Sequence, residues 1–174
     1  STVGKRLIQR GINRIYEGTN EINRMLIPGQ LLKRAMKGKI GLMQAAKALQ
    51  DEILSPSLSF DEDSGFLAGE KRLARNAKKV ALMVLGTAAQ KFMMSLADQQ
   101  EVLLNTADII MDAYQMESAI LRAEKLKNAK GETSATLVGD IAAVFCNDAI
   151  QRIEMKARNT LIAIAEGDEG RTLL

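Results

Sequence analysis

The distribution of proline constrains this chain more than any other feature of its sequence. Only 2 prolines occur among its 174 residues, and both of them, Pro28 and Pro56, lie in the first third. Because proline removes a backbone donor and breaks helices, the rest of the chain is free to form long helices. The sustained alternation of apolar and polar residues that indicates strands is absent. The sequence therefore predicts an all-α fold.

Three long stretches carry helical apolar patterns, at residues 66–97, 101–128 and about 133–164. Short turns join them, so we predict an antiparallel bundle of long helices. Thr133 or Ser134 is expected to cap the last helix. The buried stripe of that helix is expected to consist of its larger apolar residues: Leu137, Ile141, Val144, Phe145, Ile153 and Leu161.

Two shorter helices are expected before the bundle. Thr19 has the residue type of an N-cap for the first of them, and Gly38 is suited to end it. Pro28 should kink this helix or begin a fresh first turn. The second helix is expected over residues 40–54, and the Ser-rich acidic run at 55–65 reads as a loop.

Residue types that are scarce exclude several kinds of chemistry. The chain has no histidine and only one cysteine, Cys146, which excludes His-based catalysis, disulfides within the chain and Cys or His metal clusters. Asp108, Asp112 and Glu117 share one predicted helix, but a di-iron bundle needs Glu-x-x-His, so we predict no metal site. Cys146 is expected to be a small buried apolar residue.

Charge and hydropathy narrow the class of protein further. The net charge is +3 and the pI is about 9.0, yet no recognition motif with interleaved aromatics is present, so we expect no nucleic-acid partner. No run of eighteen or more consecutive apolar residues occurs, so no transmembrane helix is expected. The first residue is not Met and the chain starts in mid-pattern, so we expect a piece of a longer protein.

Residues 15–24, Ile-Tyr-Glu-Gly-Thr-Asn-Glu-Ile-Asn-Arg, are the segment best suited to chemistry. Gly18 lets the backbone approach a ligand closely, and the following helix start favours an anionic or carbonyl group. Glu17, beside Tyr16, could serve as a general base. From the residues alone, a structural turn with a solvated glutamate is the alternative.

The same run, IYEGTNEINR, resembles the signature near the end of the acyl-CoA dehydrogenase catalytic core. The resemblance implies that Glu17 removes the α-proton of a fatty acyl-CoA thioester, and that the β-hydrogen leaves as hydride to the flavin of FAD. Its backbone amide would help to bind the developing enolate oxygen. The resemblance further assigns substrate contacts to Tyr16 and Gly18, and FAD contacts to Thr19, Asn20 and Glu21.

The remainder resembles the extra C-terminal helical domain of the long- and very-long-chain members, most recognisably at 107–125. The implied domains are the end of the catalytic core at 1–38, a connecting helix and loop at 39–65, and a helical-bundle extension at 66–174. The implied reaction is the α,β-dehydrogenation of long-chain fatty acyl-CoA to trans-2-enoyl-CoA in β-oxidation. Electron-transfer flavoprotein would accept the electrons, and the parent would be a homo-oligomer. Without the flavin-binding β-domain, the chain alone is expected to be inactive.

A basic cluster opens the first long helix and consists of Lys71, Arg72, Arg75, Lys78 and Lys79. It is either a solvated face or a peripheral contact with anionic lipid headgroups, as the resemblance implies. The alternative function is therefore a non-catalytic helical module for membrane docking, oligomerisation or partner binding, which an exposed apolar patch on residues 66–165 would indicate. The expected location is a bacterial cytoplasm, with or without membrane association, or mitochondria in a eukaryote.

Methionines recur at helical spacing in the second half of the chain. Their first interpretation is core packing, and the alternative is a flexible wall for long acyl chains or a partner groove. The residues concerned are Met83, Met93, Met94, Met111 and Met116.

Overall fold

The computed structural model of the chain describes residues 11–12, 14–55 and 64–165. Within these ranges the regular secondary structure is all helical, without strands, which confirms the predicted all-α class. The elements are α2 (Asn20–Met36), α3 (Leu42–Leu54), α4 (Ala68–Phe92), the 3₁₀ helix η1 (Met93–Asp98), α5 (Gln100–Lys130) and α6 (Glu132–Ile164).

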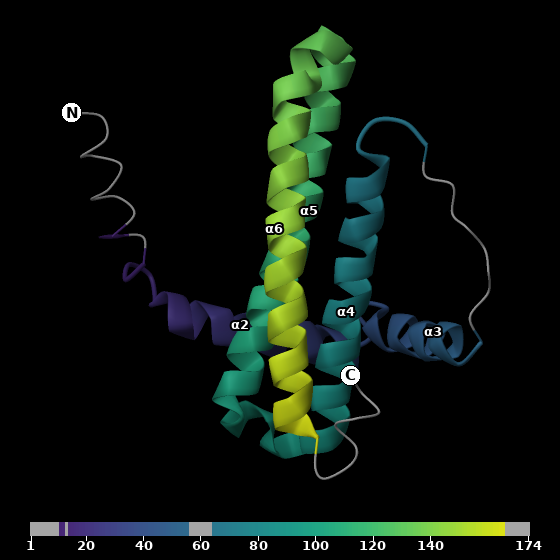
Figure 1. Ribbon diagram of the computed structural model, residues 1–174. Helices are drawn as coiled ribbons and strands as arrows, with labels where there is room; N and C mark the ends of the chain where they lie inside the picture. Colours follow the sequence, from purple (N-terminus) through teal and green to yellow (C-terminus); the bar gives the residue numbers. More distant parts are fainter. Residues whose placement is uncertain (1–10, 13, 56–63, 166–174) are drawn as a thin grey trace.

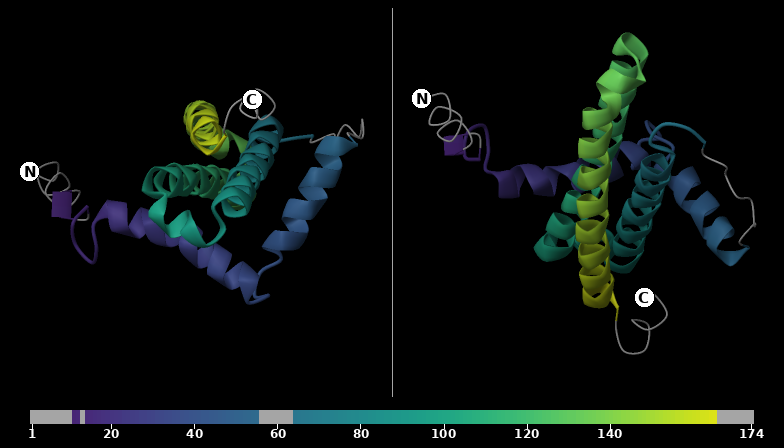
Figure 2. Two further views of the ribbon diagram at one scale, coloured as in Figure 1. Left: turned by 90° about the horizontal axis from the view of Figure 1, so that it is seen from below. Right: turned by 45° about the horizontal axis from the view of Figure 1, so that its top comes forward.

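Helices α4, α5 and α6 form the predicted antiparallel bundle (Figure 1). Helices α5 and α6 make a long hairpin that extends well past the start of α4. Helix α2 crosses the lower part of α5, and α3 packs mainly against α4. Figure 2 shows α2 and α3 lying along the outside of the bundle. The segment that carries Glu17 is therefore attached to the side of the bundle through α2.

The core of the bundle is a seam of mostly small residues spaced alternately three and four apart. This spacing keeps one face of each helix turned toward its partners, as in coiled coils. The buried residues on α6 include Ala135, Gly139, Ala142, Cys146, Ala149 and Ile153. Those on α5 include Val102, Thr106, Ile109, Ala113, Met116 and Ile120. Cys146 is fully buried, as predicted.

The buried stripe predicted for α6 is wrong for half of its residues. Leu137, Ile141 and Val144 are 70%, 59% and 62% exposed, while the other three are buried or half-buried. The side chains that face α5 are alanine and glycine instead, because the two helices approach each other closely along the hairpin. Leu137, Ile141 and Val144 therefore lie on the outer face of α6.

The helix predicted over 66–97 ends early, at Phe92. Met93 has a φ of +47°, a left-handed conformation that an α-helix cannot contain, and η1 follows it. Among the described residues, the segment Ala68–Asp98 is the one stretch that is long enough to cross a membrane and contains an 18-residue window of sufficient mean hydropathy (1.5). Part of that hydropathy comes from residues such as Ala81 and Val84, which are buried in the bundle core.

The predicted helix ends have mixed outcomes. Thr19 caps α2, and Gly38, with a φ of +65°, follows its end, as predicted. Pro28 lies buried inside α2 rather than at a new helix start. Neither predicted cap begins α6, which starts at Glu132 after Gly131 without a side-chain cap. Most of the predicted loop at 55–65, namely residues 56–63, lies outside the described residues.

Candidate functional site

The turn before α2 places Glu17 on a strained backbone. Glu17 and Gly18 have consecutive positive φ values of +58° and +98°. A left-handed conformation is uncommon for a residue other than glycine, and such residues cluster at functional sites. The backbone N–H of Asn20 donates to the Arg14 carbonyl oxygen at 3.1 Å, which closes the turn. The Glu17 side chain is thus carried by a defined turn rather than by the helix itself.

Gly18 is required in this turn for two reasons. Its φ of +98° is one that side-chain-bearing residues rarely adopt, and a Cβ built there would lie 3.1 Å from Oδ1 of Asn23. The Asn23 side chain also donates through Nδ2 to the Gly18 carbonyl oxygen at 3.0 Å. Asn23, in the second turn of α2, therefore holds the peptide next to Glu17 in place.

The start of α2 is capped from within. The Thr19 hydroxyl oxygen accepts a hydrogen bond from the Ile22 backbone N–H at 3.4 Å. The pKa of the Glu21 carboxyl is lowered, first by its own backbone N–H, then by the Thr19 hydroxyl, and further by Arg14 and Arg24. The backbone N–H groups of Ile22 and Asn20 are therefore engaged and are not free to bind the anionic or carbonyl group that this helix start was expected to favour.

The three residues predicted to contact the cofactor, Thr19, Asn20 and Glu21, differ in whether their side chains are already engaged within the chain. The Thr19 hydroxyl is used within the helix start, and Glu21 brings a negative charge to an exposed position. Asn20 is half-buried, and its side-chain amide makes no hydrogen bond to another described residue. Of the three, Asn20 is the residue that can bind a polar group without losing an internal hydrogen bond, so the segment fits a polar cofactor through Asn20.

The side chains expected to meet the substrate face outward. Tyr16 is 70% exposed and Glu17 is also exposed. A carboxylate base needs walls that exclude water and position the proton it accepts. The described part of the chain supplies the turn that carries Glu17 but does not enclose it.

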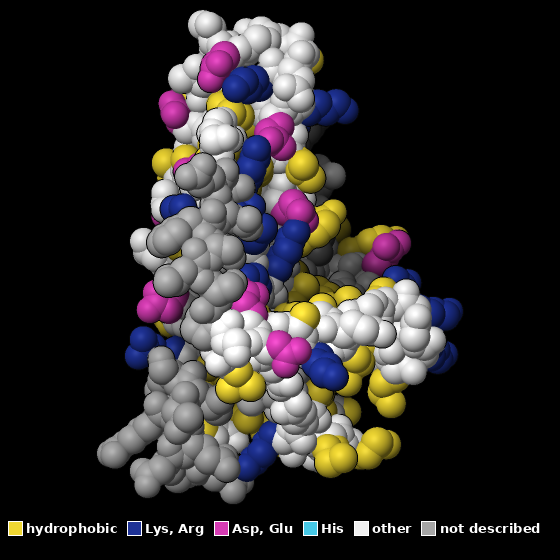
Figure 3. Space-filling model, turned by 90° about the vertical axis from the view of Figure 1, so that its right-hand side faces the viewer, with side chains coloured by type: hydrophobic (Ala, Val, Ile, Leu, Met, Phe, Trp, Pro, Cys, Tyr) yellow, Lys and Arg dark blue, Asp and Glu magenta, His cyan; other side chains and the backbone are white. Residues whose placement is uncertain are grey.

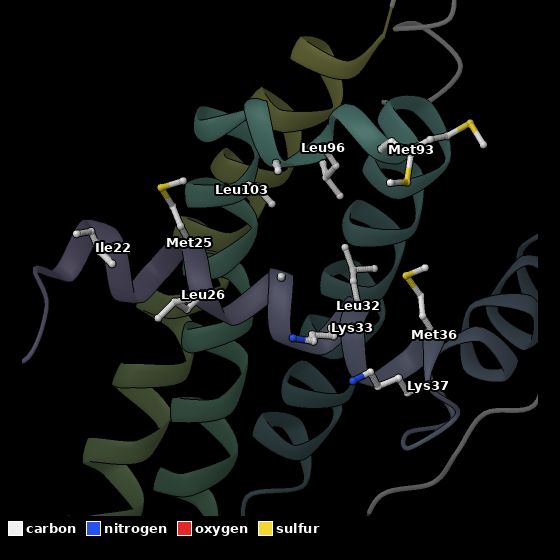
Figure 4. Close-up of a pocket in the computed structure, with 13 residues that line it drawn as sticks. Ile22, Met25, Leu26, Leu32, Lys33, Met36, Lys37, Met93, Leu96 and Leu103 are labelled. Carbon is white, nitrogen blue, oxygen red and sulfur yellow. The ribbon is translucent and has the colours of Figure 1, made fainter.

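An apolar groove of about 730 Å³ runs along α2 and begins at Ile22, five residues after Glu17 (Figure 4). It lies between α2, η1 and the start of α5, and Lys33 and Lys37 stand at its edge. Its lining includes four methionines: Met25, Met36, Met93 and Met94. Core packing is confirmed for Met116 but is wrong for Met93 and Met94, which are 76% and 93% exposed. The alternative of a methionine-lined groove describes those two.

A partly buried ion cluster, which our sequence analysis missed, attaches α2 to the bundle. Arg24 Nη2 lies 2.6 Å from Asp108 Oδ2, and Lys156 Nζ lies 2.5 Å from the same oxygen. The three residues come from α2, α5 and α6, 84 and 48 residues apart for the two pairs. No local pattern could have revealed them. The adjacent Arg24 Nε is buried without a hydrogen-bond partner.

The other carboxylates considered for a metal site also face cations. Asp112 accepts two hydrogen bonds from Arg152, from Nη2 at 2.9 Å and from Nε at 3.2 Å, and these raise the pKa of the guanidinium. Glu117 pairs with Lys78. Among the described residues, no group of three His, Cys, Asp or Glu is placed to hold a metal ion.

The predicted basic cluster is partly neutralised. Among the described residues, ion pairs join the cluster to carboxylates of neighbouring helices: Lys71 with Glu124, Lys78 with Glu117, and Lys79 with Glu52. Figure 3 shows basic and acidic side chains beside one another on this side of the molecule. The membrane contact stays a prediction, and any lipid headgroup would compete with these carboxylates.

The chain is similar in sequence and in structure to proteins named acyl-CoA dehydrogenases. A sequence model described as "Acyl-CoA dehydrogenase, C-terminal domain" matches residues 76–174. The chain is 43% identical over 163 residues to a probable acyl-CoA dehydrogenase of Bacillus subtilis (strain 168), covering 94% of the chain and 27% of that protein. It superposes with a TM-score of 0.85 and 45% identity on the crystal structure of an acyl-CoA dehydrogenase complexed with FAD from Bacillus anthracis, covering 93% of the chain and 27% of that one.

Proposed function

The chain belongs to the acyl-CoA dehydrogenase C-terminal domain family, and on that premise we propose that it is the C-terminal part of an FAD-dependent dehydrogenase of long-chain fatty acyl-CoA. The observation that carries the proposal is the Glu17–Gly18 turn, with two consecutive left-handed residues directly before a capped helix. The chain spans 27% of the length of each of the two relatives. The rest of such a protein would supply the walls that the exposed Glu17 lacks.

In this proposal Glu17 acts as the general base. Its carboxylate accepts the α-proton of the thioester, so the Cα–H bond breaks and an O–H bond forms on Glu17. Charge then develops on the thioester oxygen, where the backbone N–H of Glu17 donates a hydrogen bond. FAD, when bound, supplies the acceptor for the β-hydrogen as hydride. Asn20 is the residue of this chain best placed to bind FAD, because its side-chain amide makes no hydrogen bond to another described residue.

The finer parts of the proposal concern the whole protein. They are a long- or very-long-chain substrate, a product trans-2-enoyl-CoA within β-oxidation, electron-transfer flavoprotein as electron acceptor, and a homo-oligomeric parent. The proposed location is a bacterial cytoplasm with peripheral membrane contact. The chain alone is expected to be inactive because Tyr16 and Glu17 are exposed.

The first experiment is the visible spectrum of the full-length protein before and after anaerobic addition of palmitoyl-CoA. Bleaching of an oxidised flavin spectrum supports the reductive half-reaction with a long-chain substrate. A flavin that stays oxidised with palmitoyl-CoA but bleaches with a shorter or branched acyl-CoA supports the reaction and overturns the chain length. A well-folded protein without flavin overturns the proposal.

An exposed apolar stripe on α6 favours the second candidate function, a helical interaction module. Leu137, Ile141, Val144, Met155 and Ile162 lie on one face of the helix and are each more than half exposed. Asp148 and Gln151 separate the first three of these residues from the last two. Exposed apolar groups of this kind mark contact sites. Replacing Ile141 and Val144 with glutamine should reduce self-association in sedimentation velocity if the stripe joins copies. An unchanged distribution of full-length oligomers would remove oligomerisation from the alternatives.

A further inference from the structure

We propose that Asp108 of α5 is a positioning residue for proton transfer by Glu17, acting through Arg24 and the first turns of α2. The inference rests on the proposed function, and it gives the helical extension a direct role in the geometry of the base. The contact joins one residue of the signature run to one residue of the extension.

A short series of contacts leads from Asp108 to the base. Asp108 Oδ2 holds Arg24 Nη2 at 2.6 Å. Arg24 directly follows Asn23, whose side chain donates to the Gly18 carbonyl oxygen at 3.0 Å. Gly18 directly follows Glu17 in the left-handed turn. A displacement of α2 at Arg24 therefore moves the turn from which the Glu17 side chain projects.

Asp108 is the anion that keeps two cations together. Arg24 and Lys156 both approach its Oδ2, and the exposed fractions of the three side chains are 26%, 23% and 17% for Arg24, Lys156 and Asp108. In so little solvent, removing the negative charge leaves two positive charges facing each other across a neutral side chain. Their repulsion acts directly on α2.

The first half of α2 depends on this contact more than the second half does. The buried residues of α2 are Pro28 and Ala35, and both follow Arg24 in the sequence. Before them, Ile22 and Leu26 are 56% and 52% exposed. Arg24 pairs with Asp108 and also donates to the Leu104 carbonyl oxygen at 3.5 Å, so its polar contacts with α5 help to fasten the end of α2 nearest Glu17 to the bundle.

Asp112 provides a matched control one helical turn further along α5. It is also a partly buried aspartate, 13% exposed, and it pairs with Arg152 of α6; among the described residues it makes no ion pair or hydrogen bond with α2. Asp108→Asn and Asp112→Asn make the same chemical change in the same helix. Only the first of them disturbs the helix that directly follows the turn with Glu17.

The experiment compares both variants with wild type in the full-length, flavin-loaded protein. The first measurement is amide hydrogen exchange of residues 17–27, and the second is the rate of flavin bleaching by palmitoyl-CoA as a function of its concentration. For Asp108→Asn we expect faster exchange and a limiting rate about 10- to 100-fold lower, since a small misplacement of a catalytic group costs this much. The palmitoyl-CoA concentration for half-maximal rate should change little, and Asp112→Asn should match wild type in both measurements.

Two further variants keep the test decisive. Asp108→Glu retains the charge and should recover most of the rate. If Asp108→Asn does not fold, Arg24→Lys takes its place, because it weakens the same contact. Equal exchange in the Asp108 and Asp112 variants overturns the inference, and so does faster exchange with an unchanged limiting rate. If wild-type flavin is not bleached by any acyl-CoA, the proposed function fails, and the exchange comparison alone decides whether Asp108 holds this turn.

Discussion

Gly139 of α6 lies so close to the ring of Phe66 that a Cβ built on the glycine would be 2.9 Å from the ring's Cζ. Phe66 precedes α4, and its ring also receives the ammonium group of Lys127 at 4.8 Å from the ring centroid. The ring thus occupies the space where a side chain on α6 would otherwise lie. This contact fastens the start of α4 to the α5–α6 hairpin.

We expect Gly139→Ala and Gly86→Ala to have different effects on the free energy of unfolding of the chain. Both glycines lie inside helices, where alanine is favoured by about 0.5–1 kcal/mol. Nothing lies within 4 Å of a Cβ on Gly86, so that variant should gain this amount. Gly139→Ala must displace the Phe66 ring and should lose the gain. Urea unfolding followed by circular dichroism measures both, and equal stabilisation would show that the ring moves freely.

Cys146 should be protected from thiol reagents in the folded chain. It is fully buried in the seam of α6, and burial, with a smaller contribution from Glu70, raises the pKa of its thiol. Because the thiolate is the reactive form, both effects slow labelling. We expect reaction with a colorimetric disulfide reagent to be at least about 100-fold slower than in the urea-unfolded chain, since the helix must open first. Comparable rates in the two states would contradict the packing of α6.

The start of α2 should lose stability in acid. The pKa of Glu21 in the folded chain lies below its unfolded value, so its contribution is fully present above the unfolded pKa and disappears as the pH falls through the folded pKa. The charged carboxylate also favours the positive end of the helix. NMR titration of the Glu21 side chain, with amide exchange of the first turn of α2, measures this. Glu21→Gln should remove the part of this stability that depends on acid. If amide exchange in the first turn of wild-type α2 were as fast at neutral pH as in acid, Glu21 would not be the group responsible.

Glu17→Gln in the full-length parent should retain flavin and acyl-CoA binding and lose turnover. The amide keeps the size of the side chain but cannot accept the α-proton, and general-base catalysis contributes about 10²- to 10⁴-fold. Stopped-flow measurement of flavin bleaching by palmitoyl-CoA gives the rate. Asp140→Asn, the same exchange at an exposed position of α6, is the control. Turnover near that of wild type would assign the base to another residue.

Replacing the five cations of the basic cluster with glutamine should weaken binding to anionic vesicles. Because Lys71, Lys78 and Lys79 already face carboxylates, the expected loss is smaller than for five free cations. Glu52→Gln and Glu124→Gln free two of these lysines and should strengthen binding instead. Vesicle sedimentation with and without phosphatidylserine measures both directions. Identical partitioning of all variants would leave the cluster as a solvated face.

Much of the helix pattern could be predicted from local sequence. The predicted stretches at 101–128 and 133–164 lie within α5 and α6, and Thr19 and Gly38 bound α2 as expected. These features depend on neighbouring residues, because capping, chain stops and helical periodicity act over one or two turns. The Glu17–Gly18 turn is equally local, so its place directly before α2 could be predicted from the run that contains it.

Sequence by itself therefore determined that this chain is helical, where most of its helices lie and which short segment carries a candidate base. Only the tertiary structure decided that the seam of α6 is made of Ala135, Ala142 and Ala149 while Leu137 and Ile141 stay outside. It alone also joined Arg24 to Asp108 across 84 residues. The physical reason is that burial and ion pairing depend on which helices approach each other and how closely, and that is a property of the packed bundle rather than of any one helix.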